Sequence, residues 1–151
     1  MNIEETVNEI KKYLPFCEPF LFVDRITYIN ENEISGNHKF LKNETFYKGH
    51  FHDNPLTPGV LLLETMVQIG LVCFGIYLLD IHKTKKTFLP FLSHAESDFL
   101  EPVYPGEKVT VQSKKIYFRN NILSCKIKML NSENKVVATS ISTCFFKLIT
   151  E

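Results

Sequence analysis

The chain has 151 residues, 44% of them hydrophobic, a size that suits one domain spanning 1–151 with a single buried core. Lysine plus arginine and aspartate plus glutamate number 17 each, so the formal net charge is zero. Because nucleic-acid binding usually needs a basic excess, this balance argues against it as the main role. The four cysteines show no C-x-x-C spacing, and no basic segment leads into an apolar run near Met1. These features predict a soluble cytoplasmic protein with reduced thiols.

The first elements in chain order are predicted to be a short helix and two strands. Apolar residues recur at helical spacing through 3–14, and Pro15 and Pro19 should end that helix. A strand is expected over 20–29 and a second over 34–41, with a turn at 30–32 between them.

The middle of the chain combines an irregular loop with a long apolar helix. Residues 42–58 have loop composition, Thr57 is a plausible N-cap and Pro58 suits a first helical position. The stretch 60–79 is apolar except for Glu64, Thr65, Gln68 and two glycines. A carboxylate in hydrocarbon costs roughly 2.5–3.5 kcal/mol, which argues against a membrane span. A helix apolar on nearly all sides must then be wrapped by its own protein.

The remainder of the chain is predicted to consist of strands, over 88–99, 108–118, 122–130 and 136–148. Asn120-Asn121 and the segment 131–134 have the composition of tight hairpin turns. The sequence therefore predicts an α+β domain with one long helix inside an antiparallel sheet.

Candidate chemistry is concentrated between Gly49 and Gln68. His50 lies in the loop, and Glu64 is the one carboxylate of an otherwise apolar helical run. Apolar surroundings should raise the carboxyl pKa, which makes Glu64 a possible proton donor near neutrality. The helix start at Gly59 offers free N–H groups for a carbonyl that gains negative charge. A base, an acid and an oxyanion donor together fit β-elimination next to a thioester.

Each of these residues also has a simpler interpretation. Taken alone, His50 is also compatible with a structural histidine that is held by hydrogen bonds. Taken alone, Glu64 is also compatible with a buried carboxylate that bonds to a neighbouring strand. The run His50-x-His52-Asp53 contains metal-ligating types, but no further ligand cluster accompanies it. Cys73 on the helix is expected to pack in the core.

The segment resembles the bacterial (3R)-hydroxyacyl-acyl-carrier-protein dehydratases, whose pattern is G-H-F-P-x-x-P-x-x-P-G-V-x-x-x-E-x-x-x-Q. The matching positions are Gly49, His50, Phe51, Pro55, Pro58, Gly59, Val60, Glu64 and Gln68. The resemblance extends over nearly the whole chain, through Leu14-Pro15, Pro19-Phe20-Leu21, Val23-Asp24-Arg25, Lys42-Asn43, Phe99, Pro102-Val103 and Pro105-Gly106-Glu107.

The resemblance implies a hotdog fold and a dehydratase that converts (3R)-3-hydroxyacyl thioesters to trans-2-enoyl thioesters in fatty-acid or related synthesis. It assigns the base to His50 and the acid to Glu64, and it places substrate contacts at Gly59, Val60, Gln68 and Phe51. It implies no cofactor or metal, a substrate carried by acyl carrier protein or CoA, and a homodimer or a trimer of such dimers that shares its sites. A glutamate in the position of the acid is similar to the dehydratase-only branch of the family.

Three positions depart from the family pattern. His52 replaces a proline, and Phe16 stands where a histidine is usual. Glu96, Asp98 and Glu101 occupy a stretch where the family tends to carry basic residues for the acidic carrier protein. Carrier docking is therefore expected to use other basic residues, with Lys48, Lys114, Lys115 and Arg119 as the candidates.

Two other functions compete with dehydration. A hotdog acyl-thioesterase would use the same helix start with a carboxylate-activated water. A non-catalytic hotdog subunit would partner an active homologue, although both proton-transfer residues are present here.

Overall fold

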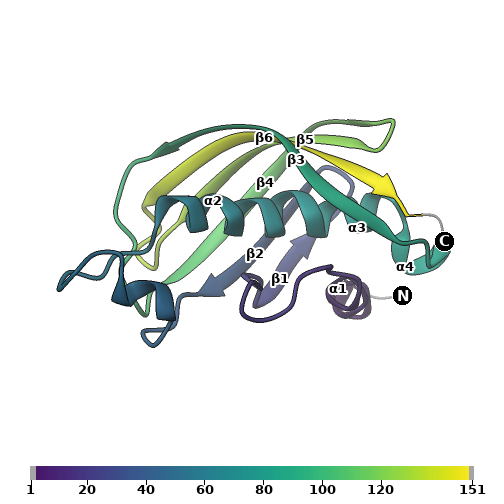
Figure 1. The fold of residues 1–151 in the computed structure, drawn as a ribbon. Helices are drawn as coiled ribbons and strands as arrows, with labels where there is room; N and C mark the ends of the chain where they lie inside the picture. Colours follow the sequence, from purple (N-terminus) through teal and green to yellow (C-terminus); the bar gives the residue numbers. More distant parts are fainter. Residues whose placement is uncertain (1–2, 150–151) are drawn as a thin grey trace.

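The computed structural model describes residues 3–149, apart from the side chain of His82, and shows a curved antiparallel sheet wrapped around one long helix (Figure 1). The six strands lie in the order β1-β2-β4-β5-β6-β3. This arrangement confirms the predicted hotdog architecture. The elements are α1 (Ile3–Lys12), β1 (Arg25–Ile29), β2 (Glu33–Lys39), the 3-10 helix η1 (Thr45–Lys48), α2 (Gly59–Val67), the π-helix η2 (Gln68–Cys73), α3 (Phe74–Leu78), α4 (Ile81–Thr84), β3 (Phe88–Phe99), β4 (Lys108–Arg119), β5 (Ile122–Leu130) and β6 (Val136–Leu148).

The central helix runs through α2, η2 and α3 without a break in the chain, and it forms the core together with the inner face of the sheet. Every residue of η2 is buried. The stretch Gly59–Leu78 is long and apolar enough to cross a membrane, with a mean hydropathy of 2.0, but 72% of it is buried inside the protein. The sheet therefore supplies the apolar surroundings that this helix needs.

The π-helical segment in the middle of the central helix has a partner on the sheet. The hydroxyl of Ser113 on β4 donates a 2.9 Å hydrogen bond to the carbonyl oxygen of Gly70. A Cβ at Gly70 would lie 3.0 Å from side-chain atoms of both Ser113 and Ile127, so the glycine allows close approach of helix and sheet. Because a π-turn departs from the regular α-helical ladder, its carbonyls need such outside donors.

The last strands follow the sequence prediction closely. β3, β5 and β6 have the predicted bounds, and β4 extends one residue further to Arg119. Asn120 and Asn121 both have positive φ, 51° and 60°, as a two-residue turn of primed type requires.

Three predicted details near the N-terminus and the central helix were wrong, and one short helix was missed. The first helix ends at Lys12, two residues early, and the first strand begins only at Arg25. The segment 20–24 is instead fastened to the central helix by Gln68, whose Oε1 accepts a 2.8 Å hydrogen bond from the N–H of Phe22. The short helix α4 was not predicted. Thr57 does not cap α2.

The edge strand β3 is twelve residues long and pairs with β6 on one side only, within residues 3–149. Most of its residues are exposed, including Leu89, Phe91, Leu92 and Phe99. A long edge strand with apolar side chains favours pairing with another strand.

Candidate active site

The loop between η1 and α2 is fastened at both ends, which fixes the position of His50. The N–H of His50 donates to the carbonyl of Phe46 at 3.1 Å, and the His50 carbonyl accepts from the N–H of Leu56 at 2.8 Å. Next along the chain, the N–H of Thr57 donates to the carbonyl of Val103 at 2.9 Å. The histidine backbone is therefore held between two anchored segments.

The ring of His50 is oriented for use as a base. Its Nδ1 lies 2.9 Å from the carbonyl oxygen of Leu56. Because a carbonyl only accepts hydrogen bonds, Nδ1 must carry the proton, and the neutral ring then keeps its lone pair on Nε2. The ring also stacks on Phe51, with centroids 3.9 Å apart. The half-buried imidazole thus presents a free basic nitrogen.

Glu64 lies on α2 in surroundings that favour its protonated form. The side chain is half-buried. Burial raises the pKa of Glu64 above its ordinary value, and the hydrogen bond from Gln68 only partly opposes this. A carboxyl group in this state can serve as a proton donor.

Gln68 orients Glu64 and is itself fully buried. Its Nε2 donates to Glu64 Oε1 at 3.0 Å and to the carbonyl oxygen of Phe20 at 3.1 Å. Both amide protons are thereby used. Because Oε1 of Glu64 accepts from Gln68, the acidic proton belongs on Oε2. The resemblance placed Gln68 among the substrate contacts; within residues 3–149 its side chain is hydrogen-bonded to Glu64 and to the backbone of Phe20 and Phe22.

The start of α2 provides two unused donors. Leu61 and Leu62 both donate their N–H groups to the carbonyl of Pro58. In the described part of the chain, no hydrogen bond involves the N–H of Gly59 or Val60. The Thr57 hydroxyl, predicted as an N-cap, instead contacts the Tyr47 hydroxyl at 2.6 Å. The helix start is therefore open to an acceptor such as a thioester carbonyl.

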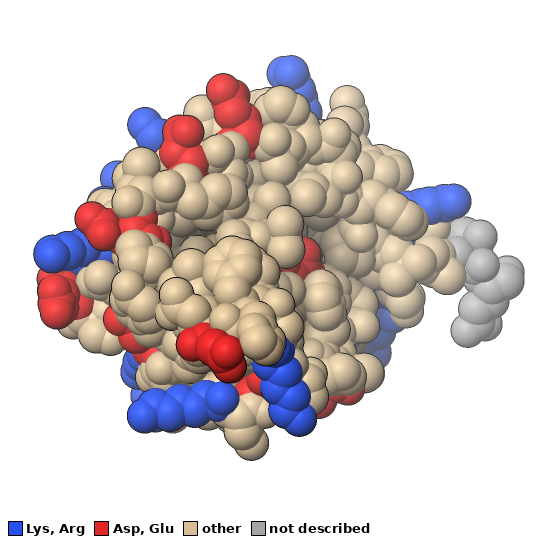
Figure 2. All heavy atoms as spheres, turned by 60° about the vertical axis from the view of Figure 1, so that its left-hand side comes forward, with Lys and Arg blue, Asp and Glu red and all other residues tan. Residues whose placement is uncertain are grey.

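The surface around the helix start is apolar. Phe51, Val60 and Phe99 are 52%, 74% and 48% exposed. The start of α2 lies beside the Phe99 ring, because a Cβ added at Gly59 would be in ordinary van der Waals contact with it at 3.6 Å. Figure 2 brings this end of the molecule forward and shows a largely uncharged centre, with charged side chains mainly around it. Such a surface suits an acyl thioester or a second protein chain.

His50 and Glu64 are not joined in one chain. Within residues 3–149, no hydrogen bond or ion pair connects the two side chains. The other candidate metal ligand in this loop, His52, lies 3.4 Å from Asp53 on the exposed surface. Among the described side chains, no group of three His, Cys, Asp or Glu residues could hold a metal ion.

The acidic residues that depart from the family pattern lie on the surface. Glu96 and Asp98 are exposed on β3, and no ion pair involves either of them in the described structure. Lys48 is exposed at the end of η1, two residues before His50. Arg119 lies at the end of β4 that is remote from the loop containing Val103. Its guanidinium carbon lies 5.0 Å from the centre of the Tyr117 ring. Only Lys48 of these basic candidates adjoins the histidine loop in the same chain.

The fold and the site define a hotdog protein of the dehydratase type. The FabA-like domain model matches residues 14–140, and the chain belongs to this family. The 3-hydroxyacyl-[acyl-carrier-protein] dehydratase FabZ of Geotalea uraniireducens (strain Rf4) is 35% identical over 119 residues, which cover 78% of this chain and 81% of that protein.

Two solved structures share the fold at low sequence identity. The dehydratase heterocomplex ApeI:P of Xenorhabdus doucetiae superposes with a TM-score of 0.75 at 14% identity, covering 90% of this chain and 89% of that chain. The thioesterase HI1161 of Haemophilus influenzae gives a TM-score of 0.60 at 22% identity, covering 84% and 80%. These likenesses support the hotdog fold.

The raised pKa of Glu64 predicts how stability changes with pH in the Glu64→Gln variant. The wild-type carboxyl contributes stability that is fully present below its ordinary pKa of 4.5 and is lost as pH rises through the raised folded-state pKa. The free energy of unfolding of Glu64→Gln, relative to wild type, should therefore increase with pH and then level off. Urea unfolding between about pH 4 and pH 8 measures this difference. A difference that is constant or falls with pH would contradict the prediction.

Proposed function

We propose that this protein dehydrates (3R)-3-hydroxyacyl thioesters to trans-2-enoyl thioesters and water in fatty-acid or related acyl-chain synthesis. The main support is the arrangement of His50 and Glu64. One presents a free basic nitrogen, and the other is a carboxyl group of raised pKa with its proton directed to Oε2. Membership of the FabA-like family and the likeness to FabZ support the same reaction.

The proposed reaction assigns one proton to each residue. His50 Nε2 removes the proton from the carbon next to the thioester carbonyl, and the developing negative charge on the carbonyl oxygen is stabilised by the N–H groups of Gly59 and Val60. The electrons then form the carbon–carbon double bond as the 3-hydroxyl leaves. Glu64 Oε2 protonates that hydroxyl, so it departs as water. A proton returned from His50 to Glu64 restores the enzyme.

We further propose that the protein is a homodimer that shares its sites between subunits. The free edge of β3 and its exposed apolar side chains support this assembly. An antiparallel pairing of two β3 strands gives a two-fold symmetric dimer in which each subunit can contribute to both sites. The histidine loop of one chain can then face Glu64 of its partner, which would explain why the two side chains are not joined in one chain. We place this single-domain enzyme in the cytoplasm.

The donor is proposed to be acyl carrier protein or CoA, and Lys48 is the residue expected to distinguish them. Because Lys48 is exposed beside the histidine loop, Lys48→Glu should lower kcat/KM on a carrier-bound substrate by about fivefold, the scale of one exposed charge contact. Activity on a short soluble thioester should change little. Arg119→Glu is the comparison variant and should have a smaller effect on the carrier-bound substrate.

Steady-state kinetics on both substrates measure these effects. Equal losses on the two substrates for Lys48→Glu would indicate damage to the site, and would contradict a docking role for this lysine.

The proposed function is tested by incubating the purified protein with 3-hydroxyacyl thioesters of several lengths, each on carrier protein and on CoA, and following enoyl formation. Enoyl product that requires His50 would support dehydration. No enoyl product with any length or carrier, from folded protein, would overturn it and would favour a non-catalytic hotdog subunit.

A further inference from the structure

The segment 20–24 connects the central helix to β2 through hydrogen bonds at both of its ends. On the helix side, Oε1 of Gln68 accepts a 2.8 Å bond from the N–H of Phe22, and Nε2 donates to the carbonyl of Phe20 at 3.1 Å. The same amide nitrogen donates to Glu64 Oε1 at 3.0 Å. The position of this segment therefore decides where the Gln68 amide lies, and through it one oxygen of Glu64.

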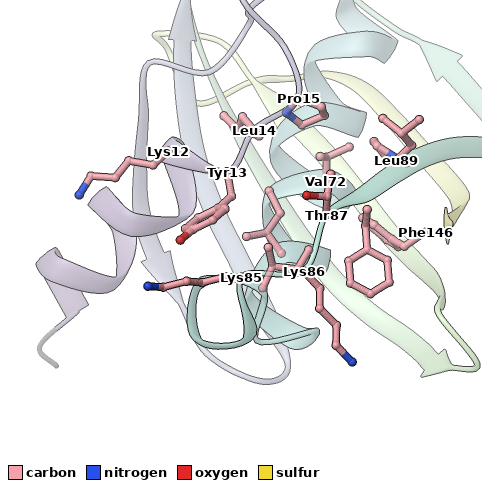
Figure 3. A pocket seen from close by; sticks show the side chains of 14 residues that line it. Lys12, Tyr13, Leu14, Pro15, Val72, Lys85, Lys86, Thr87, Leu89 and Phe146 are labelled. Carbon is pink, nitrogen blue, oxygen red and sulfur yellow. The ribbon is translucent and has the colours of Figure 1, made fainter. Parts of the chain in front are cut away.

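The chain that leads into this segment makes apolar contacts with the central helix. Figure 3 shows Leu14 and Pro15 near Val72, where the three residues line a cavity of about 270 Å³. Apolar burial holds the chain close to the helix, but it is non-directional and sets no exact position. The polar contacts of the segment 20–24 are therefore the ones that can orient Gln68.

Asp24 fixes the other end of the segment to β2 with both of its carboxylate oxygens. Oδ2 accepts a 2.7 Å hydrogen bond from the N–H of Lys39, and Oδ1 lies 3.0 Å from Nδ1 of His38. Because a carboxylate only accepts, Nδ1 of His38 carries the proton of that bond. The N–H of Asp24 also donates to the carbonyl of Asn37 at 2.9 Å. One residue is thus attached to three successive residues of β2.

His38 occupies a core position of β2. Ile34, four residues earlier on the same face of the strand, is fully buried, and His38 is only 7% exposed. Its ring meets the rings of Phe22 and Phe40 edge-on, with centroids 5.6 Å and 4.8 Å away. A polar ring in such surroundings costs desolvation, which its hydrogen bond to Asp24 offsets. His38 therefore holds the segment 20–24 at two points, by its ring and by Nδ1.

We propose that Asp24 and His38 are positioning residues for the acid of the proposed dehydratase. They hold the segment 20–24 so that Gln68 keeps Oε1 of Glu64 in place, which leaves Oε2 to give its proton to the leaving hydroxyl. This inference rests on the proposed function and adds two residues that act through Gln68.

His38→Phe is the main test variant, because phenylalanine keeps a ring against Phe22 and Phe40 but cannot donate to Asp24. The amide proton of Phe22, which bonds to Gln68, reports how firmly the segment is held. Its exchange with deuterium, followed by NMR, should become about three- to tenfold faster, the scale of one lost hydrogen bond. Ile34→Val is the matched control on the same face of β2: it should lower stability and leave this exchange rate unchanged.

The kinetic test is a double-mutant cycle with Gln68→Leu. His38→Phe alone should lower kcat on a 3-hydroxyacyl thioester about three- to tenfold with little change in KM, because the acid is displaced and substrate binding is not. In the Gln68→Leu background the same substitution should have no further effect, since the connection to Glu64 is already broken. Ile34→Val should leave kcat unchanged.

A Phe22 amide in His38→Phe that exchanges no faster than in Ile34→Val would overturn this inference, and this result does not depend on whether Gln68→Leu folds. Losses of kcat in His38→Phe and Gln68→Leu that multiply in the double variant would also overturn it. Both results would leave the dehydratase function intact. No dehydration by folded wild type would overturn the function itself, and the inference with it.

Discussion

Replacing His50 by alanine or Glu64 by glutamine is expected to lower dehydratase turnover by about 10²–10⁴-fold in each case. The alanine variant removes the nitrogen that accepts the α-proton. The glutamine variant keeps the shape of the side chain and can still accept the hydrogen bond from Gln68, but it has no acidic proton to give the leaving hydroxyl. The measurement is kcat on a 3-hydroxyacyl thioester, with folding checked by circular dichroism.

Cys73→Ala is the control for these two variants. Cys73 is fully buried in η2, and burial raises the pKa of its thiol to about 12, so it has no reactive thiolate near neutrality. This variant should lose stability more than turnover. A His50→Ala or Glu64→Gln protein that folds and turns over near the wild-type rate would show that the role assigned to that residue is wrong.

Mixed dimers of these two inactive variants are expected to regain activity. If each site takes its histidine from one subunit and its glutamate from the other, a mixed dimer has one site without either residue and one site with both. With random pairing about half of the dimers are mixed, so about a quarter of all sites are intact. The activity gained over the parents should be large, because each parent has lost several orders of magnitude.

Co-expression with two different tags allows the mixed dimers to be purified. The doubly tagged fraction should recover about half of the wild-type turnover per dimer, and each singly tagged fraction should remain inactive. The mixed dimer of His50→Ala with the double variant His50→Ala/Glu64→Gln is the control and should stay inactive. Doubly tagged dimers that are folded but as inactive as the parents would refute the shared-site model.

The sequence predicted the sheet well, because strand positions in this chain follow from local signals. The Asn120-Asn121 turn needs two residues with positive φ, and asparagine tolerates that conformation. The alternation of buried and exposed residues in β5 and β6 then fixes which face meets the helix. The buried central helix followed from its composition, since a helix without a polar face needs a surrounding sheet.

The parts that were missed depend on contacts between distant residues. Nothing local distinguishes the segment 20–24 from a strand, and it leaves the ladder because Gln68, more than forty residues away, takes its hydrogen bonds. Thr57 has the residue type of an N-cap, yet its hydroxyl is bound by Tyr47. The π-turn is supported by Ser113 on the sheet, a contact that helical periodicity does not reveal.

The candidate site, too, could be predicted from the sequence only in part. The residue types and order around His50 and Glu64 could be read from the sequence. The tautomer of His50 and the oxygen of Glu64 that carries the proton required the bonds to Leu56 and Gln68. Gln68 itself could be recognised from its spacing of four residues after Glu64, but its buried position decides that it orients the acid.

The central claim is that this protein eliminates water and does not hydrolyse the thioester. The most direct test is mass analysis of the products formed from one 3-hydroxyacyl thioester by the purified wild-type protein. Dehydration predicts a product lighter by one water with the thioester intact, and its loss in both His50→Ala and Glu64→Gln. Release of free 3-hydroxy acid and free thiol, with no enoyl thioester, would contradict the account and identify a thioesterase.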